Sequence, residues 1–426
     1  MAIDDHRLES LPNGQRLITE RLDHLRSICL GFWIPVGSRD ETGSLTGTTH
    51  FIEHLLFKGS SRYSAERIAQ VFDTLGGELN AATSKEYVVV YGKFVDEQLP
   101  AAMDVLVDML LTPTFCDLDN EREVVLEEIA MYEDAPQDLI HDQLMETVFG
   151  GHSLGHPVLG TRKSMSEVTA DQVKAYHSHH FRFSDMVVAA AGNVDHEGIR
   201  ALLLDGHPKE DGNNLVREQV HPELTPRRSF LQKETEQMHV CLGGRGLPRG
   251  DPRRFVLSVL DSLLGGSLSS RLFQEVREKR GLVYSIYSFT SMYCETGLVG
   301  VYFGCRPDRL AQVTETVDAE LGRVAREPVP ADELERAKQH LKGRMLLGLE
   351  STNSRMTRLG KAVLMGTEIL SLDEMTRRVE AVTAEQVLEL ASELFDPAGL
   401  SVAGIGTEER FFEEAFASGT LGSSTR

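Results

Sequence analysis

The chain has 426 residues, of which 41% are hydrophobic and 26% are charged, and its formal net charge is −21. A chain of this length predicts two domains rather than one core, and the composition is typical of a folded, soluble protein. The negative charge argues against nucleic acid and anionic membranes as partners and favours cationic ones.

Targeting and membrane signals are missing from the sequence. No apolar run approaches the roughly 18 residues that a membrane span needs, and the opening residues MAIDDHRLESL lack the apolar core of a secretion signal. The five cysteines are scattered and form no CxxC pair, which favours reduced thiols over a disulfide framework. We therefore expect a cytoplasmic protein that makes no membrane contact.

Strands and helices are expected in the same order in each half of the chain. An apolar strand over 27–38 precedes a helix over 48–58, and a strand hairpin follows over 78–94. The second half repeats this order at 238–248, 253–266 and 282–305. Hairpins pair strands antiparallel, and helices must bury one face. We therefore predict the α+β class, with mostly antiparallel sheets covered by helices.

An internal repeat indicates that these halves arose by duplication. VTADQV at 168–173 returns as VTAEQV at 382–387. Each copy predicts a helix capped by Thr169 or Thr383 and followed by an apolar strand. The same offset pairs Phe181 with Phe395, Val188 with Val402, and Gly192 with Gly406.

The repeat predicts two tandem domains. We expect an N-terminal domain over 1–205 and a homologous C-terminal domain over 229–426. The polar stretch 206–228 between them is the predicted linker.

The helix over 48–58 carries candidate metal ligands. His50, Glu53 and His54 lie within one stripe because a helix turns about 100° per residue, and Thr48 or Thr49 is expected to cap its start. Two imidazoles one turn apart can reach one tetrahedral ion, and the carboxylate between them can act as a base on water at that ion. The order H-x-x-E-H marks the inverzincins. The alternative is a solvated polar face. The opposite side of the helix is apolar: Phe51, Ile52, Leu55 and Leu56.

A second helix, over 118–134, supplies the missing ligand. Glu121 and Glu128 share a stripe with apolar residues, and a carboxylate there is costly to bury unless a charge or a metal compensates. Glu128 is therefore the predicted third protein ligand, which completes a known catalytic zinc set of two histidines and a glutamate. Glu121 is expected to accept the N–H of a ligand histidine. The apolar members of the stripe are Val124, Val125, Met131 and Tyr132.

Three segments resemble the M16 metallopeptidase family over nearly the whole chain: THFIEHLLFKGS, EREVVLEEI and SSRLFQEVREKRGLVYSIYS. The resemblance implies the fold of the processing-peptidase and LuxS-like metallohydrolases. It implies one Zn²⁺ per chain, with His50, His54 and Glu128 as ligands and Glu53 as general base. Glu121 matches the supporting acid of the family.

The resemblance also implies residues that bind the substrate. Arg277 and Tyr284 match a pair that contacts substrate and steadies the tetrahedral intermediate; an arginine can bind a peptide carbonyl, and a tyrosine hydroxyl can bond a developing oxyanion. The family binds an extended peptide along an edge strand, which here lies near Asn80 and Ala81. Half-size members of the family associate as dimers, so we expect a homodimer or a heterodimer with a related subunit. Whether Arg277 and Tyr284 act within one chain or across the dimer stays open.

Ten acidic residues and one basic residue lie between Asp117 and Asp142. Asp138 and Asp142 are four residues apart and would share one face of a helix. In related processing peptidases, acids at similar positions bind a basic residue beside the cleavage point. The alternative is a solvated acidic turn.

Together these features predict a zinc endopeptidase that takes an extended or unfolded peptide, including peptides with basic residues, into an enclosed acidic chamber. The alternative is a non-catalytic structural or assembly subunit of the same family. The complete set of ligands and base argues against that alternative.

Overall fold

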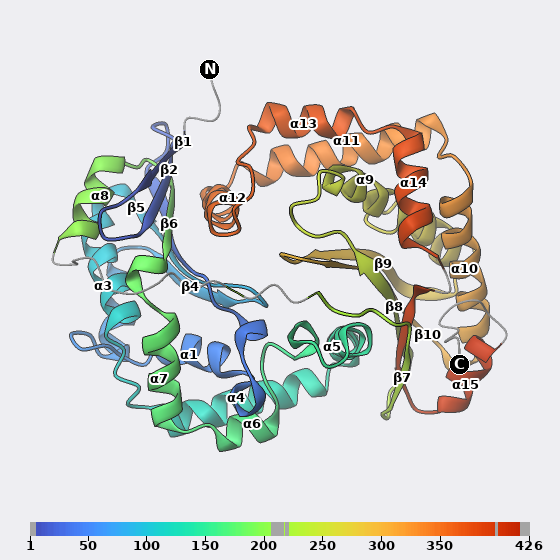
Figure 1. Ribbon diagram of the computed structural model, residues 1–426, viewed down its shortest axis with the longest axis horizontal. Helices are drawn as coiled ribbons and strands as arrows, with labels where there is room; N and C mark the ends of the chain where they lie inside the picture. Colours follow the sequence, from blue (N-terminus) through green and yellow to red (C-terminus); the bar gives the residue numbers. More distant parts are fainter. Residues whose placement is uncertain (1–5, 206–216, 218–220, 397–398, 418–426) are drawn as a thin grey trace. The chain divides into compact units, whose positions relative to one another are not determined.

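The computed structural model describes residues 6–205, 217, 221–396 and 399–417 (Figure 1). Their contacts divide the chain into two units, each built on one sheet covered by helices. The first unit comprises residues 1–130, 156–218 and 347–372, and the second comprises 131–155, 219–346 and 373–426. No helix within the described residues is both long and apolar enough to span a bilayer.

The sheet of the first unit has six strands in the order β1-β2-β6-β3-β5-β4. All neighbours are antiparallel except β2 and β6, which are parallel. Within the described residues, β4 is therefore an edge strand that pairs with β5 alone. The strands are β1 His6–Ser10, β2 Arg16–Arg21, β3 Ser27–Ile34, β4 Glu78–Thr83, β5 Val88–Val95 and β6 Val187–Gly192.

Helices cover both faces of this sheet. Alternate residues of β3, such as Leu30 and Phe32, belong to the large core under most of the helices, whereas Cys29 and Trp33 point to the other face. The helices of the first unit are α1 Thr48–Leu56, α2 Ala65–Thr74, α3 Leu99–Leu111, α4 Leu118–Glu133, α6 Arg162–Glu167, α7 Ala170–His180, α8 His196–Leu204 and α12 Thr352–Leu364.

The second unit has a five-stranded sheet in the order β7-β11-β8-β10-β9, again with one parallel pair, β7 and β11. Its strands are β7 Arg228–Gln232, β8 Met238–Gly246, β9 Val283–Met292, β10 Gly297–Cys305 and β11 Ser401–Gly406. Its helices are α5 Pro136–Phe149, α9 Arg254–Leu264, α10 Leu310–Arg326, α11 Ala331–Gly348, α13 Leu372–Glu380, α14 Ala384–Leu394 and α15 Glu409–Ala417. A π-helical turn spans Phe273–Glu278.

The two copies of the sequence repeat form the same local structure. Thr169 caps α7 and Thr383 caps α14, and each hydroxyl accepts the backbone N–H of the glutamine three residues later. The following strands, β6 and β11, each pair with one parallel and one antiparallel neighbour. The predicted fold class and duplication are therefore confirmed.

The two units are not the contiguous domains expected over 1–205 and 229–426. Two helices belong to the unit that is formed mainly by the other half of the sequence. Helix α12, orange in Figure 1, comes from the second half of the sequence but packs on β2, β3 and β6 of the first unit. Conversely, α5 comes from the first half but packs on β8 and β11. The repeat shows that the halves are duplicated, but it does not show which sheet a helix covers. Of the predicted linker 206–228, residues 206–216 and 218–220 lie outside the described residues.

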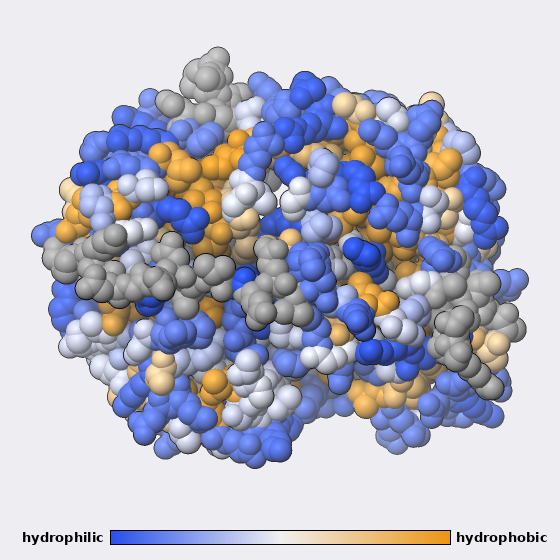
Figure 2. Space-filling view, in the orientation of Figure 1, coloured by the Kyte–Doolittle hydropathy of each residue, from blue (hydrophilic) through white to orange (hydrophobic). Residues whose placement is uncertain are grey.

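Helix α12 fits against its sheet because two glycines let the backbones approach. A Cβ on Gly360 would lie 2.1 Å from Nε1 of Trp33, and a Cβ on Gly31 would lie 2.5 Å from Sδ of Met356. The buried Glu20 also forms ion pairs with Arg355 and Arg358 of this helix. On the outer face shown in Figure 2, hydrophilic residues predominate, in keeping with the charged composition.

Candidate metal centre

Helix α1 presents its polar stripe because its apolar stripe is fully buried. Phe51, Ile52, Leu55 and Leu56 are each 0% exposed in the core of the first unit. His50 and His54 lie on the opposite side of the helix, with their ring centroids 4.6 Å apart. The amphipathic pattern in the sequence therefore gives the expected orientation.

The start of α1 is held by a residue that sequence analysis missed. The expected caps, Thr48 and Thr49, lie inside the helix, and Gly47 occupies the N-cap position with φ 90° and no side chain to offer. The buried carboxylate of Glu41 takes over, accepting the backbone N–H groups of Gly47 and Thr49 at 2.6 Å each. The expectation of a threonine cap was wrong because the cap comes from upstream of the helix rather than from its first residues.

Glu41 gives a testable pH dependence. Burial outweighs the hydrogen bonds from Thr49 and Gly47 and raises the pKa of Glu41 from 4.5 to about 8. The folded chain thus keeps a proton up to about pH 8 that the unfolded chain releases near 4.5, so the free energy of unfolding falls as pH rises through this window. Denaturant unfolding across it should show a flatter slope for Glu41→Gln than for wild type. The exposed Glu127→Gln is the control, and an unchanged slope in Glu41→Gln would refute the assignment.

The ligand atoms of His50, His54 and Glu128 converge on one space. Oε2 of Glu128 lies 3.7 Å from Nε2 of His50 and 3.3 Å from Nε2 of His54. The three ligand atoms all lie within 4.8 Å of one another, and no other group of three such residues meets this criterion in the described part of the chain. Oε2 of Glu128 is also a buried atom without a hydrogen-bond partner, as expected of an oxygen that faces a cation.

Glu121 orients one of these histidines. Its Oε1 lies 2.9 Å from Nδ1 of His54, and its other oxygen lies 2.7 Å from Nζ of Lys58. Because a carboxylate oxygen accepts this hydrogen bond, Nδ1 of His54 donates it, and Nε2 is the ring nitrogen that lies beside Glu128. Glu121 is 3% exposed and occupies the place that sequence analysis predicted for it. Lys58, its ionic partner, was not predicted.

Electrostatics suit a divalent cation at this place. Burial, with a smaller contribution from His54, lowers the pKa of His50 to about 3. The imidazole is therefore neutral at neutral pH, which is the form that binds metals. Two imidazoles and a carboxylate are a ligand set that Zn²⁺ accepts with one further position for water. The three residues thus fit a zinc ion.

Glu53 lies on the same stripe of α1 and contacts the edge strand. Its Oε2 accepts a hydrogen bond from the hydroxyl of Thr83, the last residue of β4. Burial raises the pKa of Glu53, while Thr83 and His54 act in the opposite direction. A partly desolvated carboxylate beside a metal set is the arrangement expected of a general base.

Comparison with known proteins gives the family. The sequence model of the insulinase family (peptidase family M16) matches residues 16–162, and that of the peptidase M16 inactive domain matches residues 167–341. An uncharacterized zinc protease of Streptomyces coelicolor is 43% identical over 401 residues, covering 91% of this chain and 87% of the relative. The uncharacterized zinc protease YmxG of Bacillus subtilis is 42% identical over 388 residues, covering 90% and 94%. The chain belongs to peptidase family M16.

Solved structures show the same fold. A crystal structure described as a peptidase M16 inactive domain from Pseudomonas fluorescens matches with a TM-score of 0.88 and 22% identity, covering 95% of this chain and 98% of that one. A protease from Helicobacter pylori matches with a TM-score of 0.87 and 19% identity, covering 95% and 100%. These likenesses concern the fold, and they agree with the family predicted from the sequence motifs.

The predicted peptide-binding residues of this M16 chain lie on the edge strand β4. Asn80 and Ala81 pair with Tyr91 and Val90 of β5, which leaves the other side of the strand unpaired within the described sheet. Asn80 points to the face that carries Tyr91 and Lys93 and, with them, lines a cavity. Ala81 packs against the main core of the unit. An unpaired edge of this kind can accept an extended peptide.

Arg277 and Tyr284 lie together in the second unit of this M16 chain. The guanidinium of Arg277 lies 4.9 Å from the ring centroid of Tyr284 and 4.7 Å from that of Phe273. Tyr284 is 77% exposed at the start of β9, so its hydroxyl is available to a ligand. The structure therefore brings this predicted pair together.

Asp138 and Asp142 lie one turn apart on α5 of the second unit. Tyr132 lies in the last turn of α4. Burial, together with the negative charges of Asp142 and Asp138, raises the pKa of its phenol. The Tyr132 hydroxyl donates to the carbonyl oxygen of Asp138 at 3.0 Å. The two acids thus have the helical spacing expected from the sequence.

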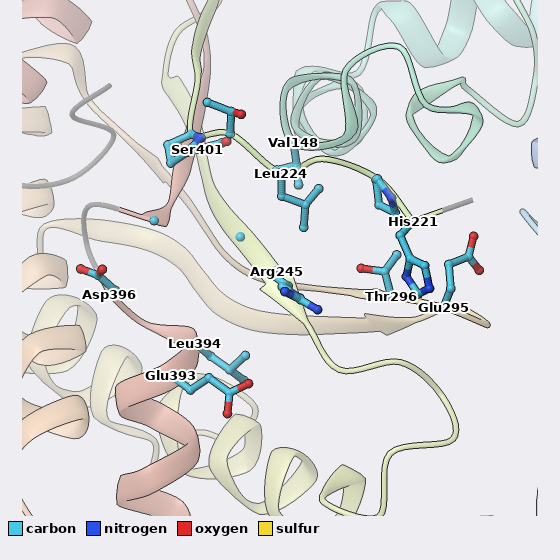
Figure 3. A pocket seen from close by; sticks show the side chains of 15 residues that line it. Val148, His221, Leu224, Arg245, Glu295, Thr296, Glu393, Leu394, Asp396 and Ser401 are labelled. Atoms are coloured by element: carbon cyan, nitrogen blue, oxygen red, sulfur yellow. The ribbon is translucent and has the colours of Figure 1, made fainter. Parts of the chain in front are cut away.

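The second unit contains a separate pocket of its own (Figure 3). It is lined by side chains of both charges, among them Arg245, Glu295 and Glu393, with the hydroxyl of Thr296 nearby. None of the predicted metal, base or peptide-binding residues lines it. The chemistry predicted from the sequence therefore does not belong to this pocket.

Proposed function

We propose that this protein is a zinc-dependent endopeptidase that hydrolyses extended or unfolded peptides. The observation that carries the proposal is the convergence of His50, His54 and Glu128 on one space, with Glu53 on the same helix stripe. The naming of relatives as zinc proteases supports the same chemistry. The alternative, a structural subunit, has no need for a base beside a complete ligand set.

Each residue of the centre has a distinct role in this proposal. His50, His54 and Glu128 hold the ion, and Glu121 fixes the orientation of His54. Zinc in such a set supplies Lewis-acid chemistry, which acidifies water and polarises a carbonyl group. Glu53 takes the proton of the attacking water and later gives it to the leaving amine.

The substrate is proposed to bind as an additional strand beside β4. The outward-facing backbone groups of β4 near Asn80 and Ala81 would hold it without regard to sequence, since β-augmentation uses main-chain hydrogen bonds. This mode requires an extended chain, which is why unfolded peptides are the proposed substrates. Arg277 and Tyr284 would bind a substrate carbonyl and the developing oxyanion, and in a homodimer they could come from either chain.

Removal and return of the metal test the proposed function. A chelator should abolish cleavage of an unfolded peptide, and about one equivalent of Zn²⁺ per chain should restore it, because the site has three protein ligands. Mg²⁺ should not restore cleavage, since it prefers six oxygen ligands. Zinc-loaded protein that cleaves no unfolded peptide would favour the structural-subunit alternative.

Asp138 and Asp142 are proposed to bind a basic side chain of the substrate. The double variant Asp138→Asn, Asp142→Asn should raise KM at least about 10-fold for a peptide with arginine beside the scissile bond, because two ionic contacts are lost. A neutral peptide should change little. The exposed Glu146→Gln on the same helix is the control for general loss of charge. An equal loss on both peptides would contradict the subsite.

A further inference from the structure

The hydroxyl of Thr83 joins the candidate base to the strand proposed to bind the substrate. Thr83 ends the edge strand β4, and its hydroxyl donates to Oε2 of Glu53 on α1. Side chains of a strand alternate between faces, so Thr83 points to the same face as Leu79 and Ala81, which pack on the core that contains α1. The base is thus held by the backbone element beside which the peptide would lie.

The bond matters because Glu53 is half-buried, so that few water molecules can take the place of the Thr83 hydroxyl. Within the described residues, Thr83 donates a hydrogen bond to the side chain of Glu53. A general base must be held within a fraction of an ångström of its working geometry, since small displacements cost large factors in rate.

The second unit contains a similar hydrogen bond between a helix carboxylate and an edge-strand hydroxyl, at a place where the described residues include no group of metal ligands. On α9, the carboxylate of Asp261 accepts a hydrogen bond of 2.7 Å from the hydroxyl of Ser288 on β9. The strand β9 is the edge strand beside β10, as β4 is beside β5, and α9 follows β8 as α1 follows β3. Among the described residues of this unit, no trio of metal ligands accompanies the bond.

This internal comparison separates two roles of the same bond. In both units the bond docks a helix onto an edge strand, which is a contribution to stability. Only in the first unit is the acceptor carboxylate the proposed base. A variant of Ser288 is therefore expected to change stability alone. A variant of Thr83 is expected to change stability and also the rate of the reaction.

We propose that Thr83 is a positioning residue, which holds Glu53 in register with the peptide bound along β4. This inference rests on the proposed function, because it takes Glu53 to be the general base. In this proposal, β4 binds the backbone of the substrate and, through Thr83, also holds the carboxylate that accepts the proton.

The test compares Thr83→Val, Thr83→Ser and Ser288→Ala in the full zinc-loaded chain. Thr83→Val should lower kcat about 10-fold to 100-fold with KM and zinc content unchanged, because the base is displaced but the ligands and the strand backbone remain. Thr83→Ser should recover most of kcat, since it keeps the hydroxyl. Ser288→Ala should lower the thermal midpoint about as much as Thr83→Val does but leave kcat unchanged.

A second readout needs no zinc and no activity. In metal-free protein, the loss of thermal midpoint in the double variant Thr83→Val, Glu53→Ala should be smaller than the sum of the single losses, because each change removes the same hydrogen bond. The proposal is overturned if Thr83→Val keeps full kcat while Glu53→Gln is inactive, or if Thr83→Ser is as slow as Thr83→Val. If Glu53→Gln itself keeps full activity, the proposed base fails and the positioning role fails with it.

Discussion

Replacing Glu53 by glutamine is expected to lower kcat on an unfolded peptide by a factor of about 10² to 10⁴, with zinc still bound. The glutamine keeps the size of the side chain and its contact with Thr83, but it cannot take up a proton. General acid–base catalysis accounts for a rate factor of this order. Zinc content by atomic absorption and initial rates on a quenched peptide measure the two quantities.

The outcome is informative only when metal and rate are measured together. Glu127→Gln, an exposed change near Glu128 on α4, should behave as wild type in both. A Glu53→Gln protein that has lost its zinc would place Glu53 among the ligands instead. A fully active Glu53→Gln protein would remove it from the mechanism.

The second large effect is expected from Glu128→Gln. An amide oxygen is a poor ligand compared with a carboxylate, so zinc affinity should fall by more than about 100-fold, beyond the loss seen when only a supporting residue is changed. Cleavage should disappear at low zinc and return in part at high zinc. Competition with a chromophoric chelator measures the affinity directly.

The neighbouring Glu127 again provides the matched control, because it lies one residue away on the same helix but is exposed. Unchanged zinc affinity in Glu128→Gln, combined with lost affinity in Glu53→Gln, would reverse the roles assigned to the two glutamates. Loss of zinc from Glu127→Gln would mean that the affinity of the site depends on the total charge of α4 rather than on one ligand.

The candidate metal centre could be proposed from the sequence because its residues follow helix periodicity. A spacing of three or four residues fixes which side chains share a face, so His50, Glu53 and His54 were found from α1 alone. Glu121 and Glu128 were found because each interrupts an apolar stripe. The predicted apolar stripe of α4 included too many residues, because Val125 is buried but Val124 and Met131 are exposed. Periodicity gives a direction on the helix, and the depth of burial depends on the neighbours.

Contacts between distant segments could not be predicted in the same way. Glu41 caps α1 from a preceding loop, Lys58 reaches Glu121 on another helix, and Thr83 reaches Glu53 from a strand. None of these pairs has a spacing that a local rule recognises. The exchange of α5 and α12 between the units was missed for a similar reason, since any amphipathic helix can cover either of two apolar sheets.

The central claim is that His50, His54 and Glu128 hold a zinc ion. The most direct test is an anomalous difference map, with data collected on both sides of the zinc absorption edge, from crystals of protein purified without added metal. We expect one peak per chain at about 2.0–2.2 Å from Nε2 of His50, Nε2 of His54 and a carboxylate oxygen of Glu128. A zinc peak on other residues, or protein that binds no zinc there even when zinc is supplied, would contradict it.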